Sequence, residues 1–147
     1  ESGNDVYYKG AHALHMLRYI IGKETLWASL KEYLQMPKEL PDNQTSTDEF
    51  ISLIEENSGM KLDWFFNQYF FKKELPTLRK LEKTIKNKKY VDLWWEEVDF
   101  KMPVEINYFS FDGKRYKKLD LDNKPKRFVI PSESDLVIDP NRWLLYK

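Results

Sequence analysis

The chain has 147 residues, of which 41% are hydrophobic and 16% aromatic, and its 24 basic residues balance its 24 acidic ones. The aromatic content argues for a packed protein, and the balanced charge provides no basic field that would favour nucleic acid or an anionic membrane. The absence of cysteine excludes disulfides, zinc–thiolate sites and a thiol nucleophile. Since no apolar run approaches the roughly 18 residues of a membrane span, we expect no membrane segment in this chain. The balanced charge leads us to expect no nucleic-acid partner.

The first half of the chain has apolar residues at helical spacing, with termination signals between the runs. The pattern predicts one helix that ends at Gly22 and a second helix that ends at Pro37, followed by a loop over 37–45. A third helix is predicted after a capping box formed by Ser46 and Glu49, and a fourth helix over 62–70 that ends by Pro76. The second helix is predicted to turn one apolar face to the core (Leu26, Trp27, Leu30, Tyr33 and Leu34).

After Pro76 the pattern alternates, as in strands that are buried on one face. The sequence predicts a hairpin of 77–86 with 90–97, a strand over 103–111 that ends in a turn at Asp112-Gly113, and further strands over 127–131, 135–138 and 143–146. Val104, Ile106 and Tyr108 are predicted to face inward, with Glu105 and Asn107 facing outward. The fold class is therefore α+β: a helical segment over 1–75 and a small antiparallel β-sandwich of six or seven strands over 76–147.

Three sets of residues are candidates for chemistry, and spacing alone favours a structural role for each. His12 and His15 share a helix face and could grip a metal, but they lack the spacing and adjacent Glu of the known zinc helix. Asp139 follows a strand, where it serves either a turn or a calcium ion. Tyr7, at the entrance of the first helix, is either a core side chain or an O–H donor to a developing oxyanion.

The stretch Tyr7-Tyr8-Lys9-Gly10-Ala11 resembles the Tyr-x-Lys-Gly motif that follows the zinc site in aminopeptidase N-type zinc metallopeptidases, the gluzincins. The apolar run to Gly22 fits this family, as do Leu62-Asp63-Trp64-Phe65-Phe66 after Ser58-Gly59 and the later stretches "MPVEI" and "DPNRWLL". The resemblance covers essentially the whole chain, with its motifs in the same order.

The resemblance implies that 1–75 is the end of a thermolysin-like catalytic domain and that 76–147 is the β-sandwich that follows it. The parent enzyme would remove N-terminal residues from peptide substrates with zinc and a Glu base. Tyr7 matches the tyrosine that donates its hydroxyl to the tetrahedral intermediate, whereas Lys9 and Gly10 match structural positions, with the glycine permitting close helix packing.

The family's zinc-binding His-Glu-x-x-His motif, its third ligand and its Gly-rich Met-Glu-Asn strand are missing from the sequence. We expect them upstream of Glu1, so this chain would be a C-terminal fragment that binds no catalytic zinc and is inactive alone. An exposed apolar patch on the helices is expected where the catalytic half would pack. The alternative is a non-catalytic interaction or scaffold module, and a zinc-binding helix upstream of Glu1 distinguishes the two.

Overall fold

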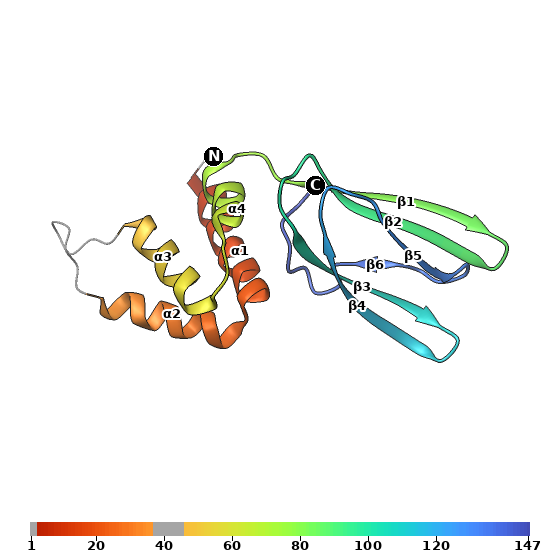
Figure 1. The fold of residues 1–147 in the computed structure, drawn as a ribbon, viewed down its shortest axis with the longest axis horizontal. Helices are drawn as coiled ribbons and strands as arrows, with labels where there is room; N and C mark the ends of the chain where they lie inside the picture. The colour runs from red at the N-terminus through yellow and green to blue at the C-terminus, as the bar shows by residue number, and fades with distance from the viewer. Residues whose placement is uncertain (1–2, 37–45) are drawn as a thin grey trace. The chain divides into compact units, whose positions relative to one another are not determined.

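The computed structural model describes residues 3–36 and 46–147, with side chains from residue 8 onward, so the predicted loop over 37–45 lies outside the described residues. The chain divides into two compact units, Glu1–Lys73 and Glu74–Lys147 (Figure 1). The first unit is helical and the second consists of β-strands. This arrangement is the α+β class that the sequence predicts, and the change of pattern at Pro76 falls close to the division.

The described residues of the first unit contain four α-helices: α1 (Gly3–Ile21), α2 (Lys23–Gln35), α3 (Thr47–Ser58) and α4 (Asp63–Phe66). Gly22 has a φ of 92° and separates α1 from α2, and Gly59 ends α3 with a φ of 65°. Both angles lie in the region that glycine adopts without steric cost. The predicted capping box is confirmed, because Ser46 Oγ accepts from Glu49 N at 3.1 Å while Ser46 N donates to Glu49 Oε2 at 2.6 Å.

The predicted fourth helix is shorter in its α-helical part and continues as a π-helix, η2 (Asn67–Phe71). It provides the densest part of the helical core, with Phe65, Phe66 and Tyr69 at most 2% exposed. The rings of Phe65 and Tyr69 lie 5.1 Å apart, and those of Phe66 and Phe70 lie 5.2 Å apart. Burial raises the pKa of Tyr69 well above its usual value, as expected of a phenol in the core.

Two details of the helical prediction are wrong. Trp27 and Leu34 were expected in the core, but they are 56% and 75% exposed, and only Leu26 and Ser29 of α2 are fully buried among the described residues. Gly10 was expected to permit close helix packing, but a Cβ added there would meet no described atom within 4 Å. Helical spacing identifies an apolar face without showing how much of it is covered.

The second unit contains two antiparallel sheets of three strands each (Figure 1). One sheet has the order β1-β2-β5, formed by β1 (Thr77–Ile85), β2 (Lys88–Glu96) and β5 (Lys126–Pro131). The other has the order β4-β3-β6, formed by β4 (Gly113–Leu121), β3 (Met102–Ser110) and β6 (Val137–Ile138). Both hairpins have two-residue loops, because Ile85 pairs with Lys88 and Ser110 pairs with Gly113.

The β core is formed by alternate residues of the two central strands. Val91, Leu93 and Trp95 of β2 are fully buried, and the predicted inward residues Val104, Ile106 and Tyr108 of β3 are at most 7% exposed. The Trp95 indole N–H donates to the carbonyl oxygen of Met102 at 3.3 Å, so this hydrogen bond joins the two sheets. Asn107 was predicted to face outward into solvent and is instead only 4% exposed.

Other strand predictions are also corrected. The hairpin loops fall at 86–87 and 111–112, one or two residues before the predicted turns at 87–89 and Asp112-Gly113. Residues 143–146 do not form a strand. The chain end instead makes two isolated backbone hydrogen bonds, in which Lys147 N donates to Pro76 O and Leu78 N donates to Lys147 O, both at 2.9 Å.

Candidate functional site

The backbone of Tyr7 lies in the first turns of α1, and its side chain lies outside the described part of the chain. The prediction that its hydroxyl faces an open site therefore stays a prediction. Tyr8 is 73% exposed, so the second tyrosine of the motif is not part of the core.

Lys9 has a structural role that its position in the motif predicts. Its ammonium donates to the carbonyl oxygen of Lys72 at 2.6 Å, and Lys72 is the residue that ends η2. A cation at this point satisfies a carbonyl that the helix leaves without a partner and interacts favourably with the helix dipole. The hydrogen bond joins the start of α1 to the end of the segment that carries Leu62-Asp63-Trp64-Phe65-Phe66.

The two histidines lie side by side on α1. Their ring centroids are 5.9 Å apart in an edge-to-face arrangement, and both residues are half-buried. His12 Nε2 is buried without a hydrogen-bond partner among the described residues. Over the described ranges, no group of three or more His, Cys, Asp and Glu side chains lies close enough together to hold a metal ion. Zinc sites in proteins use three or four protein ligands, so the pair does not fit a zinc centre.

Asp139 is a structural residue rather than a cation ligand. It is 6% exposed, its φ is 47°, and its two carboxylate oxygens accept from Trp143 N at 2.8 Å and Leu144 N at 2.9 Å. Its own N–H donates to Glu105 O at 2.7 Å. Burial and the negative charge of Asp139 together raise the pKa of Tyr146. The carboxylate therefore holds the last residues of the chain against β3.

We expect Asp139→Asn to destabilise the β unit by about 1.5–3 kcal/mol, because the backbone N–H groups of Trp143 and Leu144 lose a charged acceptor. Urea unfolding measures this loss. Asp135→Asn is a matched control, since Asp135 is an exposed residue of the same region, and it should change the unfolding free energy little. Equal effects of the two substitutions would contradict the role assigned to Asp139.

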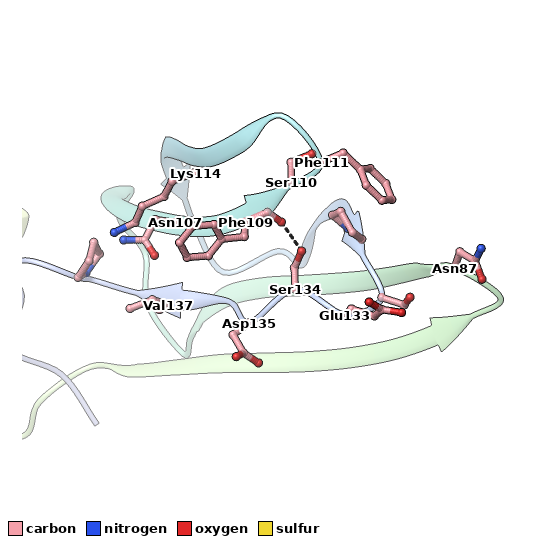
Figure 2. A pocket seen from close by; sticks show the side chains of 13 residues that line it. Asn87, Asn107, Phe109, Ser110, Phe111, Lys114, Glu133, Ser134, Asp135 and Val137 are labelled. Atoms are coloured by element: carbon pink, nitrogen blue, oxygen red, sulfur yellow. Dashed lines mark hydrogen bonds between the residues drawn. The ribbon is translucent and has the colours of Figure 1, made fainter.

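The structure also brings together residues that sequence reasoning did not select. A cavity of about 840 Å³ lies in the β unit, and Asn107, Phe109, Lys114, Ser134 and Val137 are among the residues that line it (Figure 2). The only signal in the sequence was a polar residue inside the apolar run of β3, which alternation assigned to the solvent face. Its burial depends on pairing with β6, which is distant in the sequence.

In comparisons with known proteins, no family model matches the chain, and the search of curated proteins gives no match. None of the helices in the described residues is both long enough and apolar enough to cross a bilayer.

Proposed function

We propose that this chain contributes the end of the catalytic domain and the following β-sandwich of a zinc aminopeptidase, an enzyme that removes N-terminal residues from peptides. The observation that carries the proposal is the linkage of two family motifs in the helical unit. The lysine of Tyr-x-Lys-Gly donates to Lys72 O at 2.6 Å, immediately after the helical segment that contains the second motif. Motifs that are only collinear in the sequence are thus connected by a specific contact.

The exposed apolar side chains of the helical unit also support this proposal. Trp27 and Leu34 lie on one face of α2, seven positions apart, and both are more than half exposed. Phe71 at the end of η2 is 63% exposed. A contiguous apolar patch marks a surface that packs against further protein, and in the proposal these side chains would pack against the preceding part of the catalytic domain.

Tyr7 is the residue of this chain to which we assign a chemical role. When the carbonyl carbon of the scissile peptide becomes tetrahedral, its oxygen acquires negative charge. The Tyr7 hydroxyl would donate a hydrogen bond to this oxygen, an interaction that strengthens as the charge develops. The backbone of Tyr7 belongs to the first turns of α1, and the hydrogen bond of Lys9 to Lys72 O joins this part of the helix to the end of η2.

The described residues of this chain do not fit zinc. The two neighbouring imidazoles of His12 and His15 have no third ligand in the described ranges, so no step of the reaction is assigned to them. In the proposal the zinc ligands and the general base lie in sequence that precedes Glu1.

An activity assay on the isolated chain tests whether the zinc ligands and the general base lie outside it. With added zinc and an aminoacyl-arylamide substrate, we expect no release of arylamine above the uncatalysed rate, because the chain supplies only one of the groups that the reaction needs. The measurement is a colorimetric assay, with buffer alone and heat-unfolded chain as blanks. Turnover that the folded chain sustains and the unfolded chain does not would overturn the assignment of the zinc site to preceding sequence.

A further inference from the structure

The cavity in the β unit has the size of a ligand site. Its volume of about 840 Å³ falls in the range of roughly 300–1,000 Å³ that small-molecule and cofactor sites occupy. Figure 2 shows residues of β3, β4, β6 and the loop that precedes β6 around it. All of these elements belong to one compact unit, so the cavity is defined within that unit.

Asn107 is the unusual residue in the wall of this cavity. It is 96% buried, and its backbone pairs with Tyr116 of β4 and Val137 of β6. Its side-chain amide forms no hydrogen bond with the described residues, although a carboxamide has two N–H donors and a carbonyl acceptor. The amide atoms are not among the enclosed unpaired atoms of the described residues, so they remain accessible from the cavity and can pair with a ligand.

The loop over 132–135, which lines the cavity, is held in place by hydrogen bonds before any ligand binds. Ser132 N donates to Asn87 O at 3.2 Å, Ser134 N donates to Pro131 O at 3.1 Å, and Ser134 Oγ donates to Phe109 O. Lys89 Nζ donates to Ser134 O at 2.7 Å. These bonds hold the loop over 132–135 to both sheets, so the cavity keeps its shape and a ligand loses little binding energy to ordering the wall.

The other lining groups favour a peptide as the ligand. Phe109 and Val137 are 62% and 45% exposed and offer apolar surface beside the amide. The exposed rim has two carboxylates, Glu133 and Asp135, and one ammonium, Lys114. The charge of Lys114 is partly engaged, since its Nζ lies 5.0 Å from the centroid of the Tyr116 ring. The rim therefore favours a basic side chain.

We propose that this cavity binds an extended peptide segment, with the backbone N–H and C=O of one ligand residue hydrogen-bonded to the Asn107 carboxamide. In an extended peptide the N–H and the C=O of one residue point to the same side, so a single ligand residue satisfies the acceptor and a donor of Asn107 together. An apolar ligand side chain packs on Phe109 and Val137, and a neighbouring basic side chain faces Glu133 and Asp135. The site does not depend on the function proposed for Tyr7.

The test uses the ¹⁵N-labelled 147-residue chain and the blocked tripeptide acetyl-leucyl-lysyl-leucyl-amide. Addition of the peptide into the millimolar range should shift the side-chain NH₂ resonances of Asn107 in a saturable way. Asn107→Leu should weaken binding at least about tenfold, because the apolar isostere cannot pair with the backbone N–H and C=O of the ligand residue. The same substitution at Asn123, an exposed residue that does not line the cavity, is the matched control and should leave the affinity unchanged.

Stability separates a binding role from a structural one. Replacing an amide that has no partner within the protein by an apolar group of similar shape breaks no internal hydrogen bond, so Asn107→Leu should unfold at the same or a higher urea concentration than the unchanged chain. A destabilised Asn107→Leu variant would make Asn107 a structural residue and overturn the proposal. Three other results would also overturn the proposal. The Asn107 resonances could fail to shift with peptide, or Asn107→Leu could bind the peptide as tightly as the unchanged chain. The third is that the resonances shift with maltotriose but not with peptide.

Discussion

Tyr7→Phe should lower kcat by about 10²–10³ in the zinc aminopeptidase to which we propose that this chain belongs. The substitution removes one hydroxyl and keeps the ring, so helix α1 and the zinc ligands are not disturbed. The lost hydrogen bond forms to an oxygen that is charged only in the transition state, and its removal raises the barrier by about 2.7–4 kcal/mol. Steady-state kinetics with an aminoacyl-arylamide measure the change, and metal analysis should find the same zinc content.

The neighbouring phenol provides a matched control for this experiment. Tyr8 is 73% exposed, and its position in the motif varies within the family that the chain resembles. Tyr8→Phe should therefore leave kcat close to normal. Near-normal turnover of Tyr7→Phe would remove Tyr7 from the mechanism, and a loss of zinc in that variant would mean that the residue supports the metal site instead.

Trp95→Ala should destabilise the β unit by about 3–5 kcal/mol. Trp95 has no exposed surface, its N–H bonds to Met102 O in the opposite sheet, and its ring lies 5.7 Å from that of Tyr146. The substitution leaves a large cavity and an unpaired carbonyl between the sheets. A unit of this size typically has about 4–11 kcal/mol of stability in total, so the loss is a large fraction of that stability and should clearly lower the urea concentration at which the β unit unfolds.

Trp94→Ala is the control for the effect of losing a tryptophan. Trp94 is the adjacent residue of β2, on the opposite face of the strand, and it is only half-buried. Urea unfolding followed through the NMR cross-peaks of β2 and β3 compares the two variants, and Trp94→Ala should lose clearly less stability. Similar losses from the two changes would contradict the assignment of Trp95 to the centre of the core.

The sequence predicted the order of the elements because the signals for their ends are local. Gly22 and Gly59 adopt positive φ where the helices end, and Ser46 and Glu49 cap α3 through contacts between near neighbours. Alternation likewise identified the inward residues of β3. These features depend on a few consecutive residues, so no knowledge of tertiary packing was needed.

Features that depend on distant segments were not predictable in the same way. Residues 143–146 alternate like a strand, but the buried turn at Asp139 binds the start of this segment. Trp27 and Leu34 have helical spacing, yet no described residue covers them enough to bury them. Asn107 was assigned to solvent because its burial arises from pairing with Val137, far along the chain. The candidate site shows the same division: the motif at Tyr7 is local, whereas the cavity is assembled from four strands and their loops.

Zinc content and peptidase activity of the protein that includes the sequence preceding Glu1 test the central claim most directly. The account predicts stoichiometric zinc, release of the N-terminal residue from peptides, and loss of that activity on chelation with recovery when zinc is restored. A folded protein that binds no zinc and releases no amino acid would contradict the account, and the chain would then belong to a non-catalytic scaffold.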